Sequence, residues 1–352
     1  MNLKLLIASL VPLLLSTGSV FADDLPEIRI VSSGMEVIEM YENLDYWGKL
    51  EPQEIVSVPP LLVVATTPQW RKDAAAMTVA DKKELFYRSL LPLVLYANEA
   101  IESKRARLQE IVKSLGAGQV TDEASAGFLL DLGIRYKLIS SEGDQEPVLP
   151  QGESLTALVN GLLSRVDTIP ASLALGQGAY ESGYGTSRFA LEGHSYFGQW
   201  TYGGKGMAPK EKRASKGDYG VAAYAWPLDS VHSYMMNLNT HRAYSELRAR
   251  RAQLRAAGKP VTGMALAETL THYSERGEEY VKTLTGMMRV NELYAADQAA
   301  LRQEEPVLIV DAVDEEHASA VCRELSELRS SGKLADLILS MGVRYGHAES
   351  GK

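Results

Sequence analysis

Apolar residues recur at helical spacing over a large part of the chain. The longest such stretch runs from 78 to 115, where Thr78 or Asp81 can cap the first turn and Gly116 can end the helix. Pro92 interrupts this stretch, because proline lacks the backbone N–H that an interior helical position donates. The pattern therefore predicts a long helix that breaks or kinks near Leu90.

Shorter apolar periods predict further helices at 124–139, 154–166, 170–182 and 318–334. The third of these begins at Pro170, which suits a first helical turn, with Asp167 or Thr168 as its cap. Gly183 and Gly185 follow it and allow it to end, since glycine adopts left-handed backbone angles without steric cost.

Two parts of the chain lack a helical period. Residues 25–75 mix Pro-rich and β-branched pieces, which predicts extended segments lying on a larger body, and the run PVLIVDAV at 306–313 predicts a strand. An acidic linker with Gly and Pro at 140–154 indicates a domain boundary. We expect a leader at 1–22, an extended and helical region at 23–150, a central domain at 151–296 and a small C-terminal appendage at 297–352.

The first 22 residues have the pattern of an export signal. Lys4 precedes an apolar run, and the small residues Val20 and Ala22 occupy the positions that a signal peptidase reads. The run is shorter than the roughly 20 residues of a membrane-spanning helix, and Asp23 follows it directly. We therefore expect cleavage and an exported, periplasmic protein in a Gram-negative-type envelope, without stable membrane insertion.

Charge and cysteine content exclude several classes of protein. The formal net charge is −9, and it becomes more negative when Lys4 is lost with the leader, so nucleic acid is not an expected partner. Cys322 is the only cysteine, which rules out an internal disulfide. The six histidines show no ligand spacing, so we expect no metal or other cofactor and no metal-dependent amidase or peptidase.

The run AYESGYGTSR at 179–188 places Glu181 in the last turn of a predicted helix, before an open glycine turn. Unpaired carbonyls at a helix C-terminus disfavour a carboxylate and raise its pKa. If Tyr180, Tyr184 and Phe189 also exclude water, the carboxyl keeps its proton near neutral pH and can donate it to a leaving group. Glycoside hydrolysis requires such a general acid.

Tyrosines are concentrated after this point. Ten of the 17 tyrosines lie between Tyr180 and Tyr280. A tyrosine ring can stack on a pyranose while its hydroxyl bonds to the sugar. We expect at least half of them to belong to the core.

A family resemblance is carried by the segment LLSRVDTIPASLALGQGAYESGYGTSRFALEGHSYFGQW. It is similar to the Bax-type branch of the bacterial glucosaminidases, family 73 of the glycoside hydrolases. The similarity continues through YMMNLNTHRAYSELRARRAQLR, HYSERGEEYVKTL and VNEL, so that it spans about 155 to 295. The resemblance implies a lysozyme-like domain with a small β-lobe. The expected fold class is therefore α+β, mainly helical, with a helical region before that domain.

The resemblance also implies an activity, the cleavage of the β-1,4 bond after N-acetylglucosamine in peptidoglycan glycan strands. Carried over to this chain, the general acid is Glu181, and Tyr273 lies near the scissile sugar. Glu211 in APKEKRASKGDYG fits the second carboxylate, with Asp218 and Glu192 as alternatives. Basic neighbours would keep Glu211 ionised. Inverting, retaining and substrate-assisted mechanisms all stay open, because they depend on the distance between the two carboxylates.

The residues expected to contact the glycan are Gln177, Tyr184, His194, Phe197, Gln199, Trp200 and Tyr202. Two of these depart from the family pattern. Tyr184 replaces a common tryptophan, and His194 with Ser195 replaces an asparagine pair. We expect His194 to act as a hydrogen-bonding substitute rather than as a metal ligand.

Two other functions use the same residues. A lytic transglycosylase would employ the same glutamate, but the G-L-M-Q block typical of such enzymes is absent. A catalytically silent wall-binding module would keep the groove and lose the chemistry through the changes at His194 and Ser195. The complete E-S-G motif argues against the silent module.

Overall fold

The fold is that of a computed structural model, which describes residues 26–49, 57–116, 122–140, 146–202, 206–209 and 218–330. The predicted leader at 1–22 lies outside these residues. The helices are α1 (Gly34–Asn43), α2 (Pro68–Ala76), α3 (Val79–Gly116), α4 (Glu123–Arg135), α5 (Glu153–Arg165), α6 (Ala171–Ser182), α7 (Arg188–Gly193), α8 (Pro227–Thr240), η4 (Arg242–Tyr244), α9 (Ser245–Ala256), α10 (Gly263–Ala267), α11 (Glu278–Val290), η5 (Leu293–Gln298) and α12 (Glu315–Ser330).

The strands are β1 (Glu27–Val31), β2 (Ser57–Val58), β3 (Leu61–Ala65), β4 (Trp200–Tyr202), β5 (Tyr219–Val221), β6 (Ala300–Leu301) and β7 (Val307–Asp311). They form small sheets beside a much larger helical body. The expected fold class, α+β and mainly helical, is confirmed.

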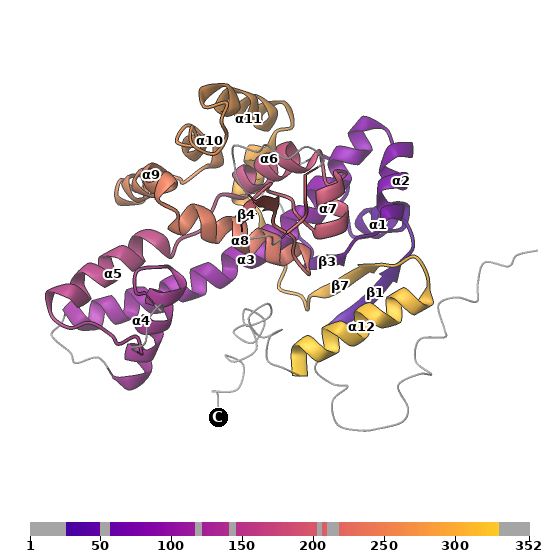
Figure 1. The fold of residues 1–352 in the computed structure, drawn as a ribbon. Coiled ribbons are helices and arrows are strands. Elements are labelled where there is room, and N and C mark those ends of the chain that lie inside the picture. The colour runs from indigo at the N-terminus through magenta and orange to yellow at the C-terminus, as the bar shows by residue number, and fades with distance from the viewer. Residues whose placement is uncertain are drawn as a thin grey trace, which may run out of the picture.

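A parallel sheet of three strands joins the two ends of the described chain. Its strand order is β1-β7-β3, with Leu308 paired to both Ile28 and Leu62. The central strand β7 is the one predicted at 306–313, and α12 lies against it (Figure 1). The segments before 76 and after 300 are therefore built into one unit.

The region 25–75 contains helices as well as the expected extended segments. In α1 the buried positions Gly34, Val37, Ile38 and Tyr41 follow a helical period, and Ser33 caps the first turn. The expectation of extended structure alone was wrong here, because a helix of ten residues offers too short a period to stand out.

Helix α3 passes through Pro92 without a break. Proline cannot donate to the carbonyl four residues earlier, which belongs to Arg88. The Tyr46 hydroxyl donates to that carbonyl instead, at 3.2 Å. The predicted break is therefore absent, because a residue outside the helix supplies the missing hydrogen bond. Neither α3 nor any other described helix has an apolar stretch of membrane-spanning length.

Helix α6 lies among α3, α10, α11 and η5 (Figure 1). A Cβ atom added at Gly178 would approach Leu90 of α3 to 2.9 Å, and one added at Gly176 would approach Met288 of α11 equally closely. Glycine at these positions therefore lets the neighbouring helices pack tightly. The small residues of α6 serve helix packing.

The start of α6 is capped from a distance. Asp297 in η5 accepts hydrogen bonds from the backbone N–H of Ser172 at 2.9 Å and from its hydroxyl at 2.8 Å. Asp167 lies buried instead and pairs with the guanidinium of Arg255 at 2.6 Å. The prediction that Asp167 or Thr168 caps this helix was wrong, because the cap comes from 125 residues further along the chain.

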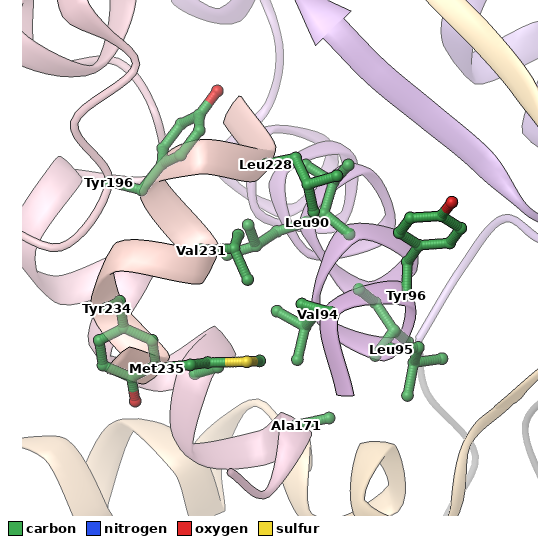
Figure 2. Packing of buried hydrophobic residues seen from close by; sticks show 14 of the residues in the cluster. Leu90, Val94, Leu95, Tyr96, Ala171, Tyr196, Leu228, Val231, Tyr234 and Met235 are labelled. Carbon is green, nitrogen blue, oxygen red and sulfur yellow. The ribbon is translucent and has the colours of Figure 1, made fainter. Parts of the chain in front are cut away.

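The core beneath α6 is formed by α3 and α8. Figure 2 shows Leu90 and Val94 of α3 facing Val231 and Met235 of α8, with Ala171 of α6 beside them. All five side chains are buried. This packing holds α6, and with it Glu181, against the long helix α3.

Candidate active site

The turn after α6 has a backbone that few residues tolerate. Gly183, Tyr184 and Gly185 all have positive φ, at 59°, 58° and 72°. The backbone N–H groups of Gly183 and Tyr184 both donate to Ala179, which closes the helix end. A non-glycine residue in this region costs about 1–2 kcal/mol. The turn is therefore strained at Tyr184 and bends the chain away directly after Glu181.

The Glu181 side chain is partly buried, and Gly198 packs against its carboxyl. A Cβ atom on Gly198, whose φ is 60°, would lie 3.0 Å from the Glu181 Oε2 atom. Only glycine therefore lets the 197–199 segment approach the carboxyl so closely.

Burial has the largest effect on the pKa of the Glu181 carboxyl. It raises the pKa of Glu181 from 4.5 to about 7, and a hydrogen bond from Tyr280 opposes the shift. The ring of Tyr184 packs edge-on against Phe86 and Tyr87 of α3, and the phenols that sense the charge of Glu181 belong to Tyr280, Tyr273 and Tyr244.

A line of hydrogen bonds connects three side chains near Glu181, those of Tyr234, Gln177 and Tyr280. The Tyr234 hydroxyl donates to Gln177 Oε1 at 2.7 Å, and Gln177 Nε2 donates to the Tyr280 hydroxyl at 2.9 Å. The Tyr280 hydroxyl is also the group that lowers the pKa of the Glu181 carboxyl, in opposition to burial. Gln177 was expected to bind substrate, but it is fully buried and both ends of its amide are engaged. It orients Tyr280 rather than facing a glycan.

Tyr273 lies beside this line. Its ring stacks on that of Tyr280, with centroids 5.5 Å apart and planes 10° apart. Its hydroxyl donates to the Phe197 carbonyl at 3.0 Å. Tyr273 therefore ties the segment that contains Gly198 to the aromatic wall beside Glu181.

Two exposed aromatic residues follow Gly198 in the chain. Trp200 and Tyr202 are 46% and 60% exposed, and they lie two residues apart on β4, on the same face of the strand. Trp200 stacks on Tyr219 of the paired strand β5 at 5.1 Å. Exposed aromatic rings of this kind offer flat apolar faces on which sugar rings can stack, and they follow the segment that packs against Glu181.

Comparison with known proteins supports the same class of site. Residues 161–293 match the glucosaminidase family, described as mannosyl-glycoprotein endo-beta-N-acetylglucosaminidase. The chain is also similar to Protein bax of Escherichia coli (strain K12), with 34% identity over 211 residues that cover 60% of this chain and 70% of that protein. The chain belongs to the Bax-type glucosaminidase-domain family. No solved structure matches it significantly.

The family assignment gives the domain a function class. A glucosaminidase is a glycosidase, so the substrate class of this domain is a glycan. The matched residues include α6 with Glu181, the β4–β5 hairpin and the tyrosines of α8 and α11. The β4–β5 hairpin forms the small β-lobe of this lysozyme-like glucosaminidase domain.

Two predicted contact residues of the glucosaminidase domain have structural partners. Phe197 is buried, and its ring stacks on that of Tyr234 at 4.0 Å. Gln199 is partly exposed, donates to the Ser233 carbonyl at 3.2 Å and accepts from the Tyr224 hydroxyl at 2.8 Å. Phe197 therefore contributes its backbone to the site, whereas Gln199 presents only part of its surface.

His194 terminates α7 with a left-handed backbone, φ 46°. Its Nδ1 atom lies 3.1 Å from the Tyr224 carbonyl, and its Nε2 atom is buried without a hydrogen bond. Burial lowers the pKa of His194, so the ring is neutral. Within the described part of the chain, His, Cys, Asp and Glu side chains form no group of three that could hold a metal ion.

The second carboxylate of the glucosaminidase site stays a prediction. Glu211 lies outside the described residues. Of the alternatives, Glu192 is exposed and pairs with Arg188 at 3.3 Å, whereas Asp218 is exposed at the start of β5. The pairing with Arg188 gives Glu192 a role on the surface of α7.

Sequence reasoning missed the partners of Glu181. Tyr280 and Tyr234 were only two of many tyrosines, and Gly198 was only part of the FGQW block. One signal was present, because Gln177 and Glu181 are four residues apart and so lie on one helix face. Nothing local, however, pairs that face with tyrosines 57 and 103 residues away.

Proposed function

We propose that this protein is an exported peptidoglycan hydrolase that cleaves the β-1,4 bond after N-acetylglucosamine, with Glu181 as general acid. The observation that carries the proposal is the partly buried Glu181 carboxyl with a pKa of about 7, packed against Gly198 in the segment that leads to the exposed rings of Trp200 and Tyr202. A carboxyl with this pKa holds its proton near neutral pH and can give it to a glycosidic oxygen.

In this proposal the sugar rings stack on Trp200 and Tyr202, which brings a glycosidic oxygen to Glu181. Proton transfer from Glu181 to that oxygen accompanies cleavage of its bond to the anomeric carbon, and positive charge develops on the ring. The oxygen of a water molecule finally bonds to the anomeric carbon, directly or after an intermediate, which completes hydrolysis. The strained turn at 183–185 keeps the chain clear of the carboxyl, so that the glycan can reach it. Glu211 is the proposed second carboxylate, and its distance from Glu181 bears on whether the mechanism is inverting, retaining or substrate-assisted.

The proposed location rests on the first 22 residues, which have the pattern of a cleaved export signal. Peptidoglycan lies outside the cytoplasmic membrane, so a hydrolase that acts on it must be exported. Location and substrate are therefore consistent with each other.

The deciding experiment is mass spectrometry of purified peptidoglycan after digestion by the mature chain, with borohydride reduction to label new ends. Reducible N-acetylglucosamine ends support the proposed glucosaminidase. Anhydro-muramic ends would make the protein a lytic transglycosylase. Binding without products would make it a silent wall-binding module.

Glu181→Gln tests the assigned acid. The amide keeps the shape of the side chain but has no acidic proton, so we expect product formation to fall by at least about a hundredfold, with peptidoglycan binding retained in a pull-down assay. Undiminished product formation in this variant would remove Glu181 from the proposed mechanism.

A further inference from the structure

Three side chains behind Glu181 form a closed line of hydrogen bonds. Tyr234 of α8, Gln177 of α6 and Tyr280 of α11 are each fully buried. The Tyr234 to Gln177 and Gln177 to Tyr280 bonds measure 2.7 and 2.9 Å. Tyr280 also lowers the pKa of the Glu181 carboxyl, in opposition to burial. Gln177 and Glu181 lie one helical turn apart on α6, so their side chains point to the same side of that helix, where Tyr280 also lies.

The direction of these bonds follows from the groups involved. The Gln177 carbonyl oxygen can only accept, so Tyr234 donates to it. The Gln177 amide nitrogen can only donate, so the Tyr280 oxygen accepts from it. A phenol has a single proton, and that of Tyr280 is therefore left for Glu181.

The opposite direction leaves a proton unpaired. If the Gln177 amide were rotated, the Tyr234 hydroxyl would accept from it and its own proton would need another acceptor. In the part of the chain that the structure describes, the Tyr234 hydroxyl makes no other hydrogen bond. An unpaired buried hydroxyl is unfavourable, so the direction toward Glu181 is the stable one.

We propose that Tyr234, Gln177 and Tyr280 act as a fixed relay of positioning residues, which makes Tyr280 a permanent hydrogen-bond donor to Glu181 and so sets the pH range over which Glu181 works as an acid. The proposal rests on the proposed function. When Glu181 passes its proton to the glycosidic oxygen, the C–O bond breaks and a carboxylate remains on Glu181. Tyr280 keeps its own proton and stabilises that carboxylate.

The other titratable groups around Glu181 do not change charge in the working pH range. Tyr273, in the segment after α10, and Tyr244 of η4 face it together with Tyr280, and burial raises the pKa of all three phenols. The guanidinium of Arg276 donates to the hydroxyl of Tyr180, whose ring packs edge-on against Tyr280. A shift in the pH profile on removal of a relay hydroxyl therefore reports on the relay.

Tyrosine-to-phenylalanine changes remove the hydroxyls and keep the packing. The Tyr280 ring is held between Tyr273, stacked at 5.5 Å, and Tyr180, edge-on at 5.2 Å. The Tyr234 ring stacks on Phe197 at 4.0 Å. Each variant therefore loses one oxygen atom and retains its ring contacts.

The test is the pH dependence of kcat/KM on soluble glycan strands released from purified peptidoglycan. The wild-type rate is expected to fall above about pH 7, where Glu181 ionises. In Tyr280→Phe this alkaline fall should move up by about one pH unit, because a hydrogen bond that favours the carboxylate is lost. We also expect kcat to fall several-fold with little change in KM. Tyr234→Phe should move the fall in the same direction by less.

Tyr273→Phe is the matched control. It removes the same atom from the neighbouring stacked ring, but that hydroxyl bonds to the Phe197 carbonyl and not to Glu181. We expect kcat to be lower than in the wild-type protein, while the pH above which kcat/KM falls stays the same.

An alkaline fall in Tyr280→Phe at the wild-type pH would overturn the relay. If circular dichroism shows that Tyr280→Phe does not fold, the pH profile of Tyr234→Phe decides. A fall in kcat/KM at a higher pH than in the wild-type protein supports the relay, and a fall at the same pH overturns it. Failure of the proposed function would look different, since the wild-type protein would then release no products or Glu181→Gln would remain active.

Discussion

At the scale of single residues, Glu181 holds its proton up to about pH 7, because burial penalises the charged carboxylate more than the Tyr280 hydrogen bond favours it. The same burial makes the ionised form a cost to the folded state. In the unfolded chain the group titrates near its ordinary value of 4.5. A property useful for acid catalysis therefore reduces stability at high pH.

Glu181→Gln should reveal this cost in thermal unfolding. The folded pKa is raised, so the contribution of Glu181 to stability is fully present below about pH 4.5 and is lost as the pH rises through about 7. The variant has no charge to bury. We expect its Tm to exceed that of the wild-type protein at pH 8 and the difference to disappear at pH 4. Equal differences at both pH values would contradict the assigned titration.

At the scale of elements, α3 shows how a proline is accommodated inside a long helix. Pro92 frees the Arg88 carbonyl, and the buried Tyr46 hydroxyl donates to it at 3.2 Å. The Tyr46 ring is held edge-on against Tyr41 at 5.3 Å. A residue 42 positions before Arg88 therefore supports a helix that the chain's own backbone cannot complete at this point.

Tyr46→Phe should lower the free energy of unfolding by about 1–3 kcal/mol, since a buried carbonyl loses its partner. Denaturant titration measures the change. A double-mutant cycle provides the control, because Pro92→Ala restores a backbone N–H four residues after Arg88. In the Pro92→Ala protein, Tyr46→Phe should lower the free energy of unfolding by clearly less than it does in the wild-type protein. An equal cost in both backgrounds would show that Tyr46 does not compensate for the proline.

At the scale of the whole molecule, the β1-β7-β3 sheet ties the two ends of the described chain to one another. Helix α3 links this sheet to the glucosaminidase domain, because it contacts β3 as well as α6 and α8. Phe86 and Tyr87 of α3 also pack against Tyr184 in the turn after Glu181. The parts outside the family match thus support the turn after Glu181 directly.

Ile309→Ala in the central strand tests this coupling. Ile309 is fully buried, and truncation of a buried isoleucine costs about 2–5 kcal/mol. We expect a loss of that size in denaturant unfolding, with secondary-structure and tyrosine-fluorescence signals changing together. Ile30→Ala in the edge strand β1 is the control, because Ile30 is 49% exposed and should cost much less. Separate transitions for the two signals would show that the sheet unfolds independently.

Much of the fold could be predicted from local patterns. The helices at 154–166 and 170–182 and the strand at 306–313 agree with α5, α6 and β7 to within one or two residues. Local patterns allowed either a break or a kink at Pro92, where α3 continues without a break, and they failed at the cap of α6. In both places the decisive hydrogen bond comes from a distant residue, Tyr46 or Asp297.

The sequence by itself determined the helical periods, the glycine turn after Ser182 and the position of Glu181 at a helix end, because these depend on steric and hydrogen-bonding rules among near neighbours. Only the tertiary structure decided which groups surround Glu181. Gly198, Tyr280 and the relay behind it come from separate elements, and their approach depends on how those elements pack. Burial, which raises the pKa of Glu181, exists only once that packing is complete.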